Sequence, residues 1–261
     1  MKDIKIINTH SHVNMLKEHN IDEAINNAKQ ENIITIVPSS TTEDIFDVDK
    51  FIQKYNDVYG YVGVYPEEAR DFSEKTLSDM ENIVKNNNKI IGIGEIGLDY
   101  YWDKSFKEIQ KEVFIKQIEF ANQMNLPINV HSREAHQDTL EILKKYNKNS
   151  IAIMHCFSGS IEFAKECIKE GIYIALGGVV TFKNAHKAKE VAINIPLEYL
   201  LLETDDPYLA PTPFRGKENQ PLYVKYVAEE IAKLRNIPTL EVTQATTQNA
   251  LKIFKTIDST N

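Results

Sequence analysis

The sequence contains few cysteines, a single tryptophan and no long apolar run. Its two cysteines, Cys156 and Cys167, are too few for a disulfide framework, and they lack the CxxC spacing of a metal or redox motif. We interpret each as a small buried hydrophobic residue rather than as a ligand or a nucleophile. No segment approaches the roughly 20 apolar residues that a membrane-spanning helix needs.

The first residues do not have the pattern of a secretory signal. MKDIKIINTHSH carries charged residues and only a short apolar stretch, whereas a signal peptide has an apolar core of about 7–15 residues. We therefore expect a cytoplasmic protein that has no membrane partner.

Positive charge is scarce as well, because 30 lysines and arginines stand against 38 acidic residues, for a formal net charge of −8. An acidic surface repels nucleic acid, so a phosphate-bearing substrate would have to be captured locally by metal ions and a few cations. The composition argues against a tight duplex binder, but it is compatible with a metal-dependent phosphodiesterase.

Short apolar runs rich in β-branched residues alternate with longer amphipathic stretches, which predicts an α/β fold. The predicted strands are Ile4–Asn8, Ile33–Pro38, Val58–Val64, Ile90–Gly94, Pro127–His131, Ile151–His155, Ile172–Leu176 and Leu200–Thr204. The predicted helices are Ile21–Glu31, Val48–Tyr55, Lys75–Val84, Ser105–Met124, Glu134–Lys145, Ile161–Glu170, Ala185–Ile193 and Pro221–Leu234. Ser105, Ser160 and Asn219 are the predicted helix caps.

Eight such alternations within 261 residues predict a TIM (β/α)8 barrel as a single domain spanning residues 1–261. A further helical segment, Leu240–Phe254, is expected to pack on the outside of the barrel. An open doubly wound sheet is the competing architecture, but the chain has no P-loop, and the glycines of IGIGEIG at 91–97 have the wrong spacing for dinucleotide binding.

Metal-ligand side chains fall at the carboxyl ends of the predicted strands. These ends meet at one mouth of a barrel, which makes residues that are far apart in sequence neighbours. The candidate ligands are His10, His12, Glu95, His131, His155 and Asp205. A lone histidine or aspartate at such a position is more often structural, but six at the same end of their strands favour a metal site.

Four imidazoles and two carboxylates exceed what one tetrahedral ion needs. We therefore expect two divalent metal ions (Mg²⁺, Mn²⁺ or Zn²⁺), bridged by Glu95, with metal-activated water as the nucleophile.

Several motifs together resemble those of the TatD family. They are NTHSHVN around His10 and His12, GEIGLDY at Gly94–Tyr100, HSR within Asn129–Arg133, HCFSG at His155–Gly159, LETDDPYLAP at Leu202–Pro211 and PFRGKENQP at Pro213–Pro221. The match runs from about residue 6 to residue 255. The resemblance implies a TIM-barrel hydrolase of the amidohydrolase superfamily, commonly a divalent-metal-dependent deoxyribonuclease with 3′-exonuclease-like activity. It also implies that the six candidate ligands occupy the family's metal-site positions.

In the working mechanism, His10 and His12 hold the first ion with Glu95 and Asp205, while His131 and His155 hold the second with Glu95. Asp205 also accepts a proton from the nucleophile, so Asp205 and Glu95 are the predicted catalytic residues. Glu203 is a candidate for orienting a ligand histidine.

The chain departs from the family at Tyr65, where members usually carry a histidine. Tyrosine cannot act as a base near neutral pH, but it can donate a hydrogen bond to a phosphate oxygen or to a metal-bound water. The alternative is a packing residue on the barrel rim. Two arginines, Arg133 and Arg215, are predicted to bind phosphate, although exposed arginines are often merely solvated.

Other residues near these motifs receive structural interpretations. Tyr100, Tyr101 and Trp102 can stack on bases, but we expect at least two of the three to cover their loop instead. Asp99 is expected to stabilise a loop, and Asp206 to cap the turn at Pro207. The remaining histidines are expected to face solvent: His19, His136 and His186.

The leading hypothesis is a nuclease that acts on DNA, either single strands or ends, with a monomer favoured. A second hypothesis retains the metal but changes the bond to an ester or amide, as in a deacylase. A third is a metal-binding protein whose turnover is weakened because Tyr65 replaces a histidine. The sequence does not separate the first two.

Overall fold

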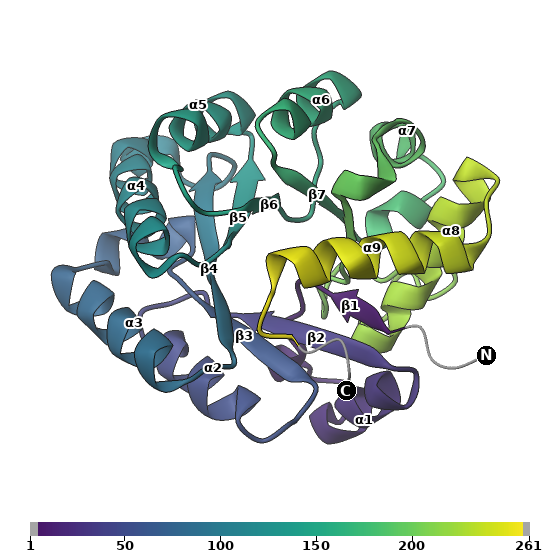
Figure 1. The fold of residues 1–261 in the computed structure, drawn as a ribbon, viewed down its shortest axis with the longest axis horizontal. Helices are drawn as coiled ribbons and strands as arrows, with labels where there is room; N and C mark the ends of the chain where they lie inside the picture. The colour runs from purple at the N-terminus through teal and green to yellow at the C-terminus, as the bar shows by residue number, and fades with distance from the viewer. Residues whose placement is uncertain (1–4, 258–261) are drawn as a thin grey trace.

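Eight parallel strands form a closed barrel in the computed structural model, which describes residues 5–257 (Figure 1). The strands follow chain order around the barrel, and the first pairs with the last through Asn8 and Leu202. Their bounds are β1 Ile6–Asn8, β2 Ile33–Pro38, β3 Val58–Val62, β4 Ile90–Asp99, β5 Ile128–Arg133, β6 Ala152–Met154, β7 Tyr173–Leu176 and β8 Leu200–Leu202. The predicted TIM barrel is confirmed.

Helices surround the barrel and return the chain from the end of one strand to the start of the next (Figure 1). Their bounds are α1 Ile21–Gln30, α2 Asp44–Ile52, α3 Glu74–Asn86, α4 Lys107–Met124, α5 His136–Tyr146, α6 Ile161–Lys169, α7 His186–Asn194, α8 Val224–Arg235 and α9 Thr239–Ile253. Ser160 caps α6 as predicted, since its side chain accepts a hydrogen bond from the Phe163 amide. None of the helices within residues 5–257 is long and apolar enough to cross a membrane.

Strand residues alternate between two cores, because successive side chains point to opposite faces of a sheet. Ile33 and Val37 of β2 face outward and pack with the helices, whereas Ile34 and Ile36 face into the barrel. Each fully buried aliphatic side chain contributes roughly 1.5–3 kcal/mol, so the outward layer fixes the ring of helices onto the barrel.

The C-terminal helix closes one end of the barrel. Ala250 and Ile253 of α9, with the following Phe254, pack against the inward residues Ile34 and Tyr61. Figure 1 shows α9 crossing in front of the strands at this end. The expectation that this segment packs merely on the outside is therefore wrong: it seals the end opposite the metal-ligand residues, so only the other mouth is available for a site.

The boundaries differ from prediction mainly around the mouth. Strand β4 continues five residues past the predicted end at Gly94, so Glu95 lies inside a strand. The last two strands that carry ligands are shorter than predicted, β6 ending at Met154 and β8 at Leu202. The predicted residue Ile4 of the first strand lies outside the described residues.

Two predicted caps are also wrong. The side chain of Asp103 accepts a hydrogen bond from the Ser105 amide, so Ser105 does not cap its helix. The amide of Asn219 instead donates to the carbonyls of Thr204 and Tyr208, and it ties the loop after β8 to the end of that strand.

Gly97 allows β4 and β5 to approach closely beside the ligand residues. A Cβ atom at this position would lie 2.0 Å from the His131 carbonyl oxygen, and the φ angle is +143°. Gly97→Ala is expected to lower the free energy of unfolding by about 2–6 kcal/mol, because the clash adds to backbone strain. Urea unfolding of the purified variant measures this change.

Gly171→Ala is the matched control, since its φ angle is also positive (+75°) but nothing lies within 4 Å of an added Cβ atom. Its free energy of unfolding should fall only by the contribution of backbone strain, about 1–3 kcal/mol. Equal losses in the two variants would show that the close approach of β4 to β5 does not matter.

Candidate metal centre

Two histidines lie just beyond the end of β1, in a segment that crosses the mouth of the barrel. His10 is fully buried, and His12 is 7% exposed. Strands on either side hold this segment, because the Thr9 amide donates to the Leu202 carbonyl (3.0 Å) and the Ser11 amide donates to the Ile36 carbonyl (3.0 Å). The two Nε2 atoms consequently lie 3.0 Å apart.

Glu95 and Asp205 complete a group of four with these histidines. The Nε2 atom of His10 lies 3.6 Å from both Glu95 Oε2 and Asp205 Oδ1, and that of His12 lies 3.7 and 3.8 Å from the same two oxygens. Ligand atoms that share an ion at about 2.0–2.2 Å stand about 3.0–3.5 Å apart. The separations from the two histidines agree with this spacing to within a few tenths of an ångström, and His10, His12 and Asp205 lie close enough together to share one cation, with an oxygen of Glu95 beside them.

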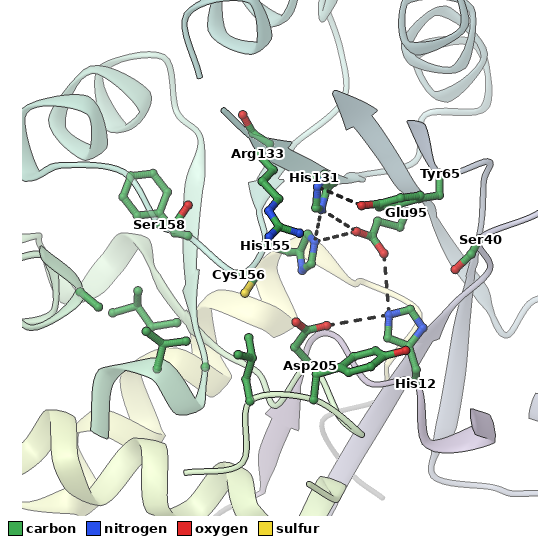
Figure 2. A pocket seen from close by; sticks show the side chains of 18 of the residues that line it. His12, Ser40, Tyr65, Glu95, His131, Arg133, His155, Cys156, Ser158 and Asp205 are labelled. Atoms are coloured by element: carbon green, nitrogen blue, oxygen red, sulfur yellow. Dashed lines mark hydrogen bonds and ion pairs between the residues drawn. The ribbon is translucent and has the colours of Figure 1, made fainter. Parts of the chain in front are cut away.

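The other oxygen of Glu95 belongs to a second group. Its Oε1 atom lies 2.9 Å from His131 Nδ1 and 2.8 Å from His155 Nε2, and these two nitrogens are 3.3 Å apart. Figure 2 shows the carboxylate between the two groups, with His131 and His155 on one side and His12 on the other. Three donor atoms at these separations form a second candidate cation group, and Glu95 contributes one oxygen to each of the two groups.

A local irregularity of β4 aims Glu95 into the mouth. The register of β4 against β5 shifts between Ile93 and Ile96, and Glu95 lies within this interval. Such irregularities re-aim side chains next to functional sites. The strand on which the carboxylate lies is buried along its whole length, so Glu95 is held on a rigid element.

Burial and mutual charge shift the pKa values of the cluster. Burial lowers the pKa of His10 well below its ordinary value, and His155 acts in the same direction. Burial also lowers that of His155, but Glu95 outweighs it and raises the pKa of His155 to about 9. The pKa of Glu95 is held well below its ordinary value despite burial, because His155 and His131 stabilise its charge. The carboxylate thus attracts positive charge to the place where a cation would lie.

Two further polar side chains orient ligand histidines through hydrogen bonds, and a third lies near one without such a bond. The Oδ1 atom of Asn129 lies 2.8 Å from His10 Nδ1, which leaves Nε2 of that ring for the cluster. Asp99 Oδ2 lies 3.0 Å from His131 Nε2 and leaves Nδ1 facing Glu95. Glu203, which we expected to orient a ligand, is fully buried with Oε1 at 3.8 Å from His155 Nδ1.

Sequence reasoning missed both of the orienting residues, Asn129 and Asp99. Asp99 was expected to stabilise a loop, and it does accept a hydrogen bond from the Tyr101 amide (2.8 Å), but it lies within β4 and contacts His131. The signal was available, since Glu95, Gly97 and Asp99 alternate along one strand and share a face. Asn129 has the same relation to His131 on β5.

Tyr65 follows β3 and packs against His131. Its hydroxyl donates to Asp99 Oδ2 (2.8 Å) and lies 3.3 Å from His131 Nε2, with the two rings edge to face at 4.8 Å. Burial and the carboxylates of Glu95 and Asp99 raise the pKa of Tyr65, so its hydroxyl remains protonated. The side chain thus combines packing with a hydrogen bond to the carboxylate that orients a ligand.

A cavity of about 680 Å³ opens over the cluster, and its polar floor includes His12, Glu95, His131, His155 and Asp205 (Figure 2). Arg133 lines this cavity, with its guanidinium 3.8 Å from the ring centroid of Tyr101 and 5.3 Å from that of Trp102. Arg215 is not among the lining residues, and its guanidinium stacks on Phe182 at 3.5 Å. Of the two arginines predicted to bind phosphate, only Arg133 reaches the cavity, which Tyr65 also lines.

Several structural expectations near the mouth are corrected. Cys156, expected to be buried, is partly exposed and lines the cavity, whereas Cys167 is buried as expected. His136 is half-buried and stacks on Phe163 at 4.9 Å instead of facing solvent. The other two histidines of that group, His19 and His186, are exposed as expected.

The aromatic run and Asp206 differ from expectation too. Tyr100 is buried and donates to Asp138 (2.8 Å), but Tyr101 and Trp102 are 46% and 63% exposed, so only one of the three covers the loop. Asp206 is fully buried and accepts a hydrogen bond from the Thr204 hydroxyl instead of capping an exposed turn.

Comparison with known proteins agrees with this arrangement. The family model described as TatD related DNase matches residues 7–255 of the chain. The chain belongs to the TatD family. Among relatives of this TatD chain, a Bacillus subtilis protein described as the uncharacterized metal-dependent hydrolase YabD is 44% identical, over 96% of this chain and 99% of the relative. YcfH of Escherichia coli K12, with the same description, is 32% identical over 95% of each chain.

A solved structure shows the same fold. The TatD homolog YJJV from Escherichia coli K12 is 30% identical, with a TM-score of 0.89 over 96% of this TatD chain and 98% of that one. The chain is thus a member of a family of metal-dependent hydrolases, and its clustered histidines and carboxylates are a donor set suited to such ions.

Proposed function

We propose that this TatD chain is a phosphodiesterase that uses two divalent ions and acts on single-stranded DNA or on DNA ends. The observation that carries the proposal is the shared carboxylate: Oε2 of Glu95 faces His10 and His12, while Oε1 faces His131 and His155. Sites with two ions suit in-line displacement at phosphorus, because attacking and leaving oxygens are both stabilised. The family description as a DNase supports the same reaction.

The residues would share the chemistry as follows. Divalent ions, when bound, supply Lewis acidity and lower the pKa of water from 15.7 towards about 7. His10, His12, Glu95 and Asp205 would hold the first ion, and His131 and His155 would hold the second with Glu95. Asn129 and Asp99 keep His10 and His131 in the ring orientation that presents a nitrogen to the cluster.

Asp205 is placed to accept a proton from the attacking water. Its carboxylate is 16% exposed and lines the cavity, while the other carboxylate of the cluster, that of Glu95, is 5% exposed. Burial raises the pKa of Asp205 above its ordinary value. A general base of this kind contributes about 10²–10⁴-fold to a rate.

Arg133 would hold a phosphate oxygen of the substrate, because its planar group already stacks on two exposed aromatic rings at the cavity edge. Arg133→Ala is expected to lower kcat/KM for an oligonucleotide by about 10–100-fold, the value of a charge-assisted hydrogen bond. Steady-state kinetics on a labelled single strand would measure this change.

Arg133→Lys should recover only part of the loss, since lysine lacks the planar fork. Arg215→Ala provides the comparison, and its effect should stay below about threefold because Arg215 stacks on Phe182 outside the cavity. A larger effect at Arg215 than at Arg133 would place the phosphate contact on the loop after β8.

Tyr65 would act through Asp99, to which its hydroxyl donates, and through its own place at the cavity wall. Because the hydroxyl stays protonated, it cannot serve as a base, and its single proton can reach a phosphate oxygen only if it leaves Asp99.

The function is tested by incubating the purified chain, loaded with Mn²⁺ or Mg²⁺, with an end-labelled single-stranded oligonucleotide. Product formation above that of Asp205→Asn supports a nuclease. A parallel panel of acyl esters and amides tests the other reaction classes of such barrels. Turnover of an acyl substrate without cleavage of any phosphodiester would replace the proposal by a deacylase.

A further inference from the structure

One wall of the cavity is apolar, although its floor is formed by histidines and carboxylates. The wall comes from the ends of β6 and β7, from α7 and from the loop after β8. Its side chains are Phe157, Leu176, Val179, Val180, Ala188 and Leu209. Most of these are buried, but Leu209 is 39% exposed, so an apolar side chain is displayed at the opening.

The backbone holds Leu209 in this position. Its φ angle is +54°, a left-handed conformation that leucine rarely adopts. Its carbonyl oxygen packs against Gly178, where an added Cβ atom would lie 2.0 Å away. Hydrogen bonds from the Thr212 amide (2.8 Å) and hydroxyl (3.3 Å) to Thr181 tie the same two loops together.

Left-handed residues gather at this mouth. Within residues 5–257, the non-glycine residues with positive φ include three asparagines, which tolerate that conformation, and four others. Three of these four line the cavity: Cys156, Asp205 and Leu209. Strain of this kind is retained where the surrounding structure serves a site. Leu209 and the candidate ligand Asp205 thus both have a left-handed backbone conformation, which is energetically unfavourable for each residue.

We propose that this apolar wall is a subsite for a nucleobase of the nucleotide that carries the scissile phosphate. The inference rests on the proposed phosphodiesterase function. His155 of the polar floor and Phe157 of the wall are two residues apart in the chain, and floor and wall line one and the same cavity. A substrate whose phosphate lies on the floor thus places its next uncharged group against the wall.

The chemistry of the wall favours a base over the other parts of a nucleic acid. A sugar–phosphate backbone is charged and hydrated, whereas every base has an apolar face that stacks on side chains. The six wall side chains offer no hydrogen-bonding groups, so they cannot read the edge of a base. The subsite should therefore require a base while accepting any of the four.

The size and charge of the cavity agree with a single nucleotide. Its volume of about 680 Å³ lies in the range of sites that hold one small molecule. Arg133 supplies a cation in the same cavity, and the aromatic side chains of Trp102 and Tyr208 also line it. Phosphate and base thus each have a complementary surface.

The test uses small chromogenic diesters with the Mn²⁺-loaded chain. Thymidine 3′- and 5′-(p-nitrophenyl phosphate) carry a base on either side of the phosphorus, and methyl p-nitrophenyl phosphate carries none. For the better of the two nucleoside esters, kcat/KM should exceed that of the methyl ester by at least about tenfold. Replacing thymine by the other three bases should change kcat/KM by less than about threefold.

Leu209→Gly removes the displayed side chain, and glycine adopts a positive φ freely, so the variant should keep its melting temperature. The ratio between nucleoside and methyl esters should fall on the order of tenfold. Leu240→Ala, at another exposed leucine (45%), should keep the wild-type ratio. Val179→Asp, which places a charge in the wall, should lower the ratio as Leu209→Gly does.

The outcomes separate the two proposals. If neither the three diesters nor the end-labelled oligonucleotide is hydrolysed, the phosphodiesterase function fails and the subsite fails with it; if only the oligonucleotide is cleaved, the base subsite is wrong. If all are hydrolysed at similar rates, or if Leu209→Gly lowers them equally, the base subsite is wrong while the phosphodiesterase function stands. A strong preference for one base would mean that polar groups outside the wall recognise it.

Discussion

Replacing Asp205 by asparagine is expected to lower kcat on a single-stranded oligonucleotide by about 10²–10⁴-fold. The amide has nearly the same shape but cannot accept a proton, and it is a weaker metal ligand than a carboxylate. Asp205 lies 3.6 Å from His10 and 3.8 Å from His12, so both of its roles concern the same ion. Initial rates measured at saturating Mn²⁺ report the loss.

Measuring the rate of Asp205→Asn as a function of Mn²⁺ concentration distinguishes the role of Asp205 as a metal ligand from its role as a proton acceptor. If weaker metal binding explains the loss, more Mn²⁺ should restore the rate; if proton transfer explains it, the rate stays low at every concentration. Asp103→Asn is the matched control, because this aspartate lies on the rim but is exposed and pairs with Arg70 at 3.4 Å. Activity of Asp205→Asn within threefold of the wild type would remove Asp205 from the catalytic residues.

Replacing Glu95 by glutamine should lower the metal content from two ions per chain to one or none. Glutamine retains the volume of the side chain but loses the charge that both groups share, since Oε2 lies 3.6 Å from His10 and Oε1 lies 2.8 Å from His155. Activity should fall by more than about 100-fold, the upper end for loss of an outer partner of a metal ligand. Elemental analysis after dialysis against Mn²⁺ measures the content.

Thermal unfolding gives an independent readout of the same variant. An ion that binds only the folded chain stabilises it by about 2.7 kcal/mol at a concentration 100 times its Kd. The rise in melting temperature with Mn²⁺ should therefore shrink in Glu95→Gln. The control is Glu134→Gln, at an exposed carboxylate that pairs with Lys104. This variant should keep both the wild-type metal content and the wild-type rise in melting temperature with Mn²⁺. If Glu95→Gln still contained two ions per chain, the proposal that one carboxylate serves both ion sites would be contradicted.

The alternation of apolar runs and amphipathic stretches predicted every strand of the barrel, with errors at the ends. The largest error is in β4, which continues to Asp99 although glycines at 92, 94 and 97 resemble the start of a loop. Those glycines are explained by close packing against Tyr61, Asn129 and His131, which a local pattern does not reveal.

Among the site residues, side chains directly after apolar runs were predictable, and side chains that act through a neighbour were not. His10, His12, His131 and His155 each follow a short β-branched stretch, and the structure gathers all four. Asp99 and Asn129 contact His131 and His10 only across strands. The apolar wall was also missed, since its residues come from four separate segments.

The sequence alone determined the barrel and the set of candidate ligands, because hydrophobic period and residue type are local properties and the carboxyl ends of parallel strands meet at one mouth. Only the tertiary structure decided how the two oxygens of Glu95 divide the histidines, which carboxylate and amide orient each ring, and which arginine reaches the cavity. These depend on separations of a few ångströms between segments up to about 200 residues apart, which closure of the barrel sets.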